Sequence, residues 1–257
     1  MINHMEIVDL IKEAADLVMS YYSQKVNVKF KHDNSVVSEV DEKSHHLICE
    51  KLAKITPHIQ VISEECQDHD CVDIEQMKDF WLIDPIDGTE GFLNANDNFT
   101  INIALMENKR PKYGFIIIPC KGEVYYNDDE HAYCIVSSGE RKIITTRSLP
   151  QGGYDALMSS KVKQRTIDQL SSLKIRSITK IGSALKFCYI AAGAADLYYR
   201  HGTTMEWDTA AGDAILTKAG GSINNPDGTL FNYCKPGFKN GPFVASGGKH
   251  PLIIPWS

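Results

Sequence analysis

The sequence contains no hydrophobic run near the length of a membrane span. Its longest compact apolar stretch, Phe115–Pro119, has the length of a β-strand, whereas a spanning helix needs about 20 apolar residues. An excess of basic residues is also missing, since 27 Lys and Arg stand against 33 Asp and Glu, for a formal charge of −6. A nucleic-acid-binding face needs clustered Lys and Arg. We therefore expect neither a transmembrane segment nor a nucleic-acid polymer as partner.

The seven cysteines show no pairing pattern. Their number is odd, their spacings are irregular and no C-x-x-C motif occurs, which argues against a zinc site or a secreted disulfide framework. The first residues lack the cationic and apolar regions of an export signal. No G-x-G-x-x-G or P-loop motif is present, which disfavours the usual dinucleotide and NTPase sites. We expect a cytoplasmic protein with reduced thiols.

The apolar pattern predicts a folded chain with two halves of different texture. Hydrophobic residues make up 43% of the sequence, which is typical of a globular protein. Apolar spacing predicts helices over 5–22 and 42–55, the second capped by Asp41. Alternation between 100 and 136 predicts antiparallel strands. Beyond Pro150 strands and helices alternate, so we expect an α/β (α+β) fold with an N-terminal half, 1–150, and a smaller C-terminal half, 151–257.

The remaining predicted elements are shorter. We expect helices over 164–173, 183–192 and 207–219, and strands over 60–63, 80–83, 100–106, 113–119, 123–126, 131–136, 156–159, 175–179, 195–199, 222–224 and 243–246.

The segment Trp81–Phe92 carries the strongest chemical signal. A buried strand ends at Asp84, a proline forces a turn, and Asp87 follows three residues later, so both carboxylates can converge on one point. The backbone of Gly88 and Thr89 would offer N–H groups to an anion if a helix starts there. Carboxylates beside a phosphate need hard cations between them, and Mg²⁺ bridges such groups. The same residues also suit an ordinary turn at a strand end.

Three further acidic segments lie at predicted element ends. Glu64 and Glu65 follow a strand, Asp41 stands at a helix start, and Glu206 with Asp208 opens a helix. Singly, each suits a helix cap or a solvated acidic face. Together they are acids at element ends, where the ligand sites of layered folds collect.

Asp84–Thr89 and Trp207–Ala211 resemble the two signatures of the inositol monophosphatase superfamily of lithium-sensitive, Mg²⁺-dependent phosphatases. Within it the chain is most similar to the CysQ-type 3′(2′),5′-bisphosphate nucleotidases. This similarity is carried by Lys31–Ser35 with Ser38 and Asp41, Phe99–Leu105, Gly182–Cys188, Gly193–Tyr198 with Arg200, and Glu206–Asp208. The resemblance implies a layered αβαβα sandwich with the active site between its halves. It also implies removal of the 3′-phosphate from 3′-phosphoadenosine 5′-phosphate, which leaves AMP.

The resemblance further implies a role for each site residue. Glu64, Asp84 and the Ile86 carbonyl would hold one Mg²⁺, and Asp84, Asp87 and Asp208 a second. A third, weaker cation would bind Glu64 and waters. Thr89, backed by Asp41, would orient and deprotonate the attacking water, and Glu65 would support the ligands through a bound water. The backbone over 87–89, with Gly88 at its centre, would cradle the phosphate. The remaining substrate contacts would come from Ser183, Lys186, Arg200 and Asp208.

Several positions depart from the nucleotidase pattern and keep other substrates open. Glu90 and Gly91 stand where these enzymes usually have lysine and glutamate, Val162 where they tend to have histidine, and Ala184 at a common serine. None is an implied metal ligand. The alternatives are an inositol monophosphatase or sugar-phosphate phosphatase and, from another class, a non-catalytic relative that binds a phosphorylated ligand. The sequence leaves the oligomeric state open.

Overall fold

The structure is a computed structural model that describes residues 2–30, 36–66, 77–148, 150–248 and 251–254. The segment Lys31–Ser35, used above for the family resemblance, lies outside the described residues. Within the described ranges, no helix has both the length and the apolar character needed to cross a bilayer.

The first half consists of two long helices, a short one and a large sheet. The helices are α1 (His4–Ser20), α2 (Glu39–Ile55) and α3 (Thr89–Leu93). The strands are β1 (Val28–Phe30), β2 (Val36–Ser38), β3 (Gln60–Ser63), β4 (Asp79–Asp87), β5 (Thr100–Glu107), β6 (Arg110–Ile118), β7 (Glu123–Asn127), β8 (Ala132–Ile135) and β9 (Arg141–Ile144). Strands β3 to β9 form one sheet in chain order, antiparallel apart from the β3–β4 pair, while β1 and β2 pair separately.

The second half alternates helices with strands. Its helices are α4 (Gln164–Asp168), α5 (Leu185–Ala191) and α6 (Ala210–Lys218), with 3₁₀ turns at Pro119–Lys121 in the first half and at Gln169–Ser172, Glu206–Asp208 and Pro236–Phe238 in the second. Its strands are β10 (Tyr154–Met158), β11 (Ile175–Lys180), β12 (Leu197–Arg200), β13 (Thr204–Met205), β14 (Ser222–Asn224), β15 (Lys239–Asn240) and β16 (Phe243–Ser246). Five of them form a mixed sheet in the order β11-β10-β12-β16-β14, and β13 pairs with β15.

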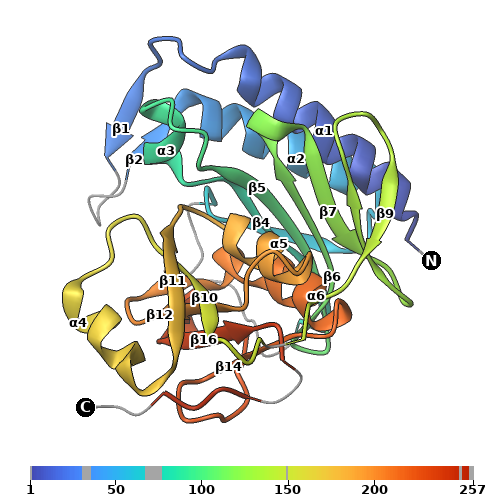
Figure 1. Ribbon diagram of the computed structural model, residues 1–257. Helices are drawn as coiled ribbons and strands as arrows, with labels where there is room; N and C mark the ends of the chain where they lie inside the picture. The colour runs from blue at the N-terminus through green and yellow to red at the C-terminus, as the bar shows by residue number, and fades with distance from the viewer. Residues whose placement is uncertain (1, 31–35, 67–76, 149, 249–250, 255–257) are drawn as a thin grey trace.

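Five layers follow from the alternation of side chains along the strands. On β4, Trp81 and Ile83 pack with α1 and α2, whereas Phe80 and Leu82 face α5 and α6. Figure 1 shows these two helix pairs on opposite faces of the large sheet. Because successive strand residues point to opposite faces, a sheet buried on both sides needs a helix layer on each. The second sheet repeats this arrangement on its own two faces.

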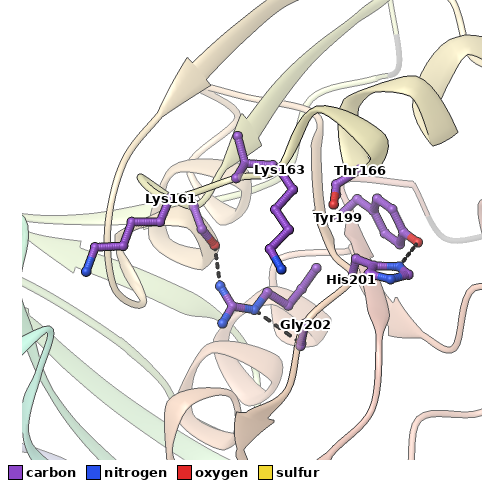
Figure 2. A pocket seen from close by; sticks show the side chains of 9 residues that line it. Lys161, Lys163, Thr166, Tyr199, His201 and Gly202 are labelled. Atoms are coloured by element: carbon purple, nitrogen blue, oxygen red, sulfur yellow. Dashed lines mark hydrogen bonds between the residues drawn. The ribbon is translucent and has the colours of Figure 1, made fainter. Parts of the chain in front are cut away.

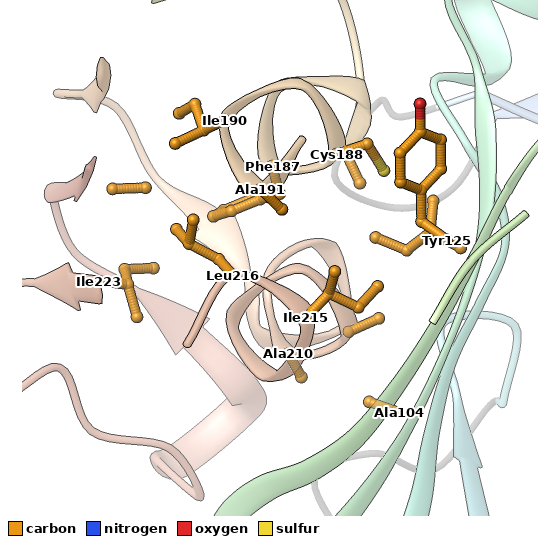
Figure 3. Packing of buried hydrophobic residues seen from close by; sticks show 14 of the residues in the cluster. Ala104, Tyr125, Phe187, Cys188, Ile190, Ala191, Ala210, Ile215, Leu216 and Ile223 are labelled. Atoms are coloured by element: carbon orange, nitrogen blue, oxygen red, sulfur yellow. The ribbon is translucent and has the colours of Figure 1, made fainter. Parts of the chain in front are cut away.

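The middle layer joins the halves into one core. Residues of α5 and α6 lie between Ile223 of β14 on one side and Ala104 and Tyr125 of the large sheet on the other (Figure 3). On β16, Phe243 belongs to this core, while Val244 packs on the outer side with Leu170, which follows α4. The layers therefore run α1/α2, large sheet, α5/α6, small sheet, α4. The αβαβα sandwich is confirmed.

Most predicted elements are present, with differences at their ends. The strands expected over 60–63, 222–224 and 243–246 have those bounds, whereas β1, β2, β9, β13 and β15 were not predicted because they are short or lie at edges. Two local predictions are wrong. Ser38 rather than Asp41 is the N-cap of α2, with Asp41 at the third helical position of a capping box. Ser183 lies outside α5, with a left-handed φ of 46°.

Candidate active site

The end of β4 places two carboxylates on one turn. Asp84 still pairs with Asn102 of β5, but the register shifts before Asp87 pairs with Thr100. The Asp84 side chain is 1% exposed and accepts a hydrogen bond of 3.1 Å from the Ile86 amide. Asp87 accepts hydrogen bonds from Asn102 Nδ2 at 3.2 Å and from Thr100 Oγ1 at 3.4 Å. Hydrogen bonds to the turn and to β5 thus fix the orientation of both acids.

Gly88 links this turn to α3 in a way that needs glycine. Its φ is 94°, and a Cβ there would lie 2.8 Å from the carbonyl oxygen of Asn98. Such a φ is strained for other residues, so glycine allows the chain to reverse directly after Asp87. The next residue, Thr89, begins α3.

Thr89 is connected to the start of α2. Its hydroxyl lies 3.0 Å from Asp41 Oδ1 and 3.3 Å from the Ile86 carbonyl oxygen. Asp41 is 1% exposed, and its other oxygen, Oδ2, accepts hydrogen bonds from the amide of Ser38, at 2.9 Å, and from its hydroxyl. Burial raises the pKa of Asp41, opposed by these hydrogen bonds. The capping box of α2 therefore holds a buried carboxylate directly behind the Thr89 hydroxyl.

Asp208 comes from the second half of the chain. It ends the 3₁₀ turn before α6, and its Oδ2 accepts a hydrogen bond of 2.8 Å from the Met205 amide. The neighbouring Glu206 is fully buried and accepts hydrogen bonds from the amides of Cys234 at 2.8 Å and Lys235 at 3.0 Å. Glu206 thus anchors the turn that presents Asp208.

The three aspartates converge. One carboxylate oxygen each from Asp84, Asp87 and Asp208 lies within 4.8 Å of the others. Burial raises the pKa of all three, and that of Asp84 is raised further by the charges of Glu64 and its partners in the cluster. Oxygen-only ligands in a cluster of like charge suit a hard divalent cation, which offsets their repulsion. The residues therefore fit a metal site of the Mg²⁺ type.

The glutamates lie in the turn that follows β3. The Glu64 amide donates to the Ile83 carbonyl at 3.1 Å, and the Glu65 amide donates to the Ser63 hydroxyl at 3.3 Å. The charge of Glu64 also raises the pKa of Asp41, of Asp87 and of Asp208, so Glu64 contributes to the negative potential at the cluster.

A cationic wall from the second half faces the aspartates. Asp87, Asp208, Ser183, Lys186 and Arg200 are among the residues lining a pocket of about 150 Å³, hereafter the catalytic pocket. The Lys186 ammonium is nearly buried and donates to the carbonyls of Ile181, at 3.3 Å, and of Ser183. Burial lowers the pKa of Lys186 to about 8, while Asp87 opposes that shift. Within the described part of the chain, the Ser183 hydroxyl is buried with no hydrogen-bond partner.

The structure thus brings together the residues singled out from the sequence. The first half contributes Asp41, Glu64, Asp84, Ile86, Asp87, Gly88 and Thr89, and the second half contributes Ser183, Lys186, Arg200 and Asp208. Sequence reasoning left Asn102, Ser159 and Tyr198 without site roles. Ser159 accepts a hydrogen bond of 2.6 Å from Arg200, and the Lys186 ammonium lies 4.7 Å from the centre of the Tyr198 ring. Asn102 and Tyr198 lie in two of the segments that carry the family resemblance, Phe99–Leu105 and Gly193–Tyr198, and could have been found there.

Comparison with known proteins identifies the class to which this fold and site belong. Residues 4–255 match the model of the inositol monophosphatase family, and the chain belongs to that family. The predicted resemblance is confirmed.

More specific similarity is to proteins named CysQ. The chain is 35% identical to the 3′(2′),5′-bisphosphate nucleotidase CysQ of Buchnera aphidicola, over 94% of this chain and 92% of the relative. It is also 35% identical to the protein of the same name from Salmonella typhimurium, over 91% and 97% of the two chains. The crystal structure of CysQ from Bacteroides thetaiotaomicron superimposes with a TM-score of 0.79 at 28% identity, covering 96% and 97% of the two chains.

Proposed function

We propose that the protein is a Mg²⁺-dependent phosphomonoesterase that hydrolyses the 3′-phosphate of 3′-phosphoadenosine 5′-phosphate to give AMP and phosphate. The observation that carries the chemistry is the convergence of Asp84, Asp87 and Asp208 beside the hydrogen bond from Thr89 to Asp41. The choice of substrate is supported by relatives named 3′(2′),5′-bisphosphate nucleotidase at 35% identity over nearly the whole chain.

The metal identity and number belong to this proposal. Glu64, Asp84 and the Ile86 carbonyl would hold one Mg²⁺, and Asp84, Asp87 and Asp208 a second. A third cation would bind Glu64, and Glu65 would act through a water. When bound, the cations offset the negative charge on the phosphate and on its leaving oxygen. The pKa values of the three aspartates, raised first by burial and further by neighbouring carboxylates that include Glu64, support cation binding at this point.

Thr89 and Asp41 would receive the proton of the attacking water. The Thr89 hydroxyl donates to Asp41, so a lone pair on its oxygen can accept a hydrogen bond from that water. A proton passed to Thr89 is matched by one passed from Thr89 to Asp41, which is general-base catalysis through a relay. Because burial raises the pKa of Asp41, this carboxylate accepts a proton more readily than an exposed aspartate.

The rest of the site would bind the substrate. Gly88 and Thr89 would offer backbone N–H groups to the scissile phosphate, and Ser183, Lys186, Arg200 and Asp208 would contact the nucleotide. On this view residues 1–150 supply most metal ligands, and residues 151–257 supply substrate contacts and the last ligand. These are functional units rather than separate folding units, since both contribute to the core around α5 and α6. A cytoplasmic location remains a prediction.

A phosphate-release panel tests the proposal. Turnover of 3′-phosphoadenosine 5′-phosphate, inositol 1-phosphate and sugar phosphates is measured with Mg²⁺ and with EDTA. We expect the largest kcat/KM on the nucleotide and none without the metal. A clear preference for inositol phosphate would favour an inositol monophosphatase instead. No turnover of any substrate would favour a non-catalytic binding protein.

A single variant tests the site itself. Asp87→Asn keeps the size and shape of the side chain but removes its charge and one of its two acceptor oxygens. We expect it to abolish Mg²⁺-dependent turnover while the circular dichroism spectrum stays native. Undiminished turnover contradicts the assigned metal site.

A further inference from the structure

A second pocket adjoins the catalytic pocket. It has a volume of about 220 Å³ and lies between the loop after β10 and the end of β12. We call it the side pocket; its lining includes Lys163, Tyr199 and His201, and it shares Ser159 and Arg200 with the catalytic pocket. Its volume is several times the roughly 30 Å³ that one water takes up in the liquid. The two pockets meet at Ser159 and Arg200.

The two pockets differ in charge. The catalytic pocket is lined by Asp87 and Asp208, so an anion there needs cations between itself and the protein. The described lining of the side pocket contains no acid, and it includes Lys161, Lys163 and Arg200. A negatively charged group can bind in the side pocket directly to side-chain cations.

The two lysines of the side pocket differ in their partners. Lys161 is exposed and forms an ion pair of 2.5 Å with Glu90 of α3. Lys163 is also exposed, and its ammonium has no hydrogen bond or ion pair to any residue that the structure describes. Figure 2 shows Lys163 extending toward Gly202 and His201, whereas Lys161 extends away from them. Lys163 is the lysine placed to meet a ligand.

The other cations nearby are already held by the protein. Arg200 donates from Nη1 to Ser159 Oγ at 2.6 Å, from Nη2 to the Thr203 carbonyl at 3.0 Å and from Nε to the Gly202 carbonyl at 3.2 Å. Lys186 is nearly buried beside Asp87 and donates to two backbone carbonyls. Arg200 is therefore a cation held in place by hydrogen bonds, whereas the ammonium of Lys163 has no partner among the described residues.

We propose that the side pocket binds the phosphate that is not hydrolysed, and that Lys163 is the residue by which the enzyme selects nucleotides with a second phosphate. The inference rests on the proposed function and deepens it. With the 3′-phosphate at the aspartates, the 5′-phosphate reaches the side pocket past Arg200. The positive charges of Lys163 and Arg200 then offset the charge of this phosphate, and the N–H groups of Arg200 that are not already hydrogen-bonded can donate to it.

The test compares two substrates that differ only in that phosphate. The kcat/KM ratio of 3′-phosphoadenosine 5′-phosphate to adenosine 3′-monophosphate is measured for the wild type and for Lys163→Gln. A charge-assisted hydrogen bond is worth about 1.5 kcal/mol or more, so we expect the ratio to fall about 10-fold. Lys163→Arg, which keeps the charge, should restore most of it.

Lys161→Gln is the matched control, because it removes an equal charge two residues away. We expect it to change the ratio less than 2-fold, or about 0.4 kcal/mol. An unchanged ratio in Lys163→Gln, or an equal fall in Lys161→Gln, overturns the inference and leaves the proposed function intact. A wild-type ratio near one also overturns the inference, whereas a lack of turnover of 3′-phosphoadenosine 5′-phosphate would overturn the proposed function itself.

Discussion

The hydroxyl of Thr89 and the carboxylate of Asp41 lie 3.0 Å apart although 48 positions separate them in the chain. The contact depends on the capping box of α2, since the Ser38 amide and hydroxyl hold Asp41 Oδ2 and leave Oδ1 for Thr89. A helix-capping arrangement therefore also positions the proposed proton acceptor. This double use explains why a carboxylate at the start of a helix is buried rather than solvated.

Thr89→Val should remove the relay while keeping the shape of the side chain. General-base catalysis contributes about 10² to 10⁴ in rate, so we expect kcat to fall within that range. KM should change little, because the hydroxyl is proposed to act on water rather than on the nucleotide. Steady-state kinetics at saturating Mg²⁺ check this, with Thr89→Ser as the control that keeps the hydroxyl. Equal losses in both variants would contradict the relay.

Asp84→Asn should stabilise the metal-free protein. The pKa of Asp84 lies well above 3.8 in the folded state because of burial and neighbouring acids. The folded protein thus holds a proton that the unfolded chain has released, and stability falls as pH rises from about 4 through the folded pKa. In EDTA at pH 7.5 we expect a higher Tm for Asp84→Asn than for the wild type, with no further rise on adding Mg²⁺. A lower Tm in EDTA would oppose this account.

Mg²⁺ binding should weaken as pH falls. Cations and protons compete for the same carboxylates, and the pKa values of Asp84, Asp87 and Asp208 are all raised. Calorimetric titration should give a larger Mg²⁺ dissociation constant at pH 6 than at pH 8. Asp213→Asn is the control, since burial raises the pKa of this acid to about 6 outside the aspartate cluster. Loss of the pH dependence in that variant would contradict the view that protons compete with Mg²⁺ at the three clustered aspartates.

Gly114→Ala should disturb the contact between β6 and α6. A Cβ at Gly114 would lie 2.1 Å from the Ala211 carbonyl oxygen, and such overpacking costs about 1–3 kcal/mol. We expect the free energy of unfolding, measured in urea, to fall by that amount, with reduced activity because α6 follows the turn that carries Asp208. At Gly152 a Cβ would meet no atom within 4 Å, so Gly152→Ala is the control and should change stability little.

The local sequence pattern was enough to predict most of the helices and strands that form the layers. The apolar spacing of α1 and α2 and the alternation of β5 are local features that can be read directly from the sequence. The edge strand β9 was missed because it has only four residues and its first two, Arg141 and Lys142, are basic. Ser183 was wrongly predicted to lie inside a helix, because the neighbouring residues give no signal of a left-handed backbone conformation.

By itself the sequence determined which acids are available and that two of them, Asp84 and Asp87, share one turn, since proline and glycine restrict or free the backbone locally. Only the tertiary structure decided that Asp208 joins them and that Lys161, but not Lys163, finds an ion-pair partner among the described residues. The first outcome depends on packing between segments more than 100 residues apart. The second depends on which ion pairs form between the two halves of the chain. No local pattern encodes such long-range contacts.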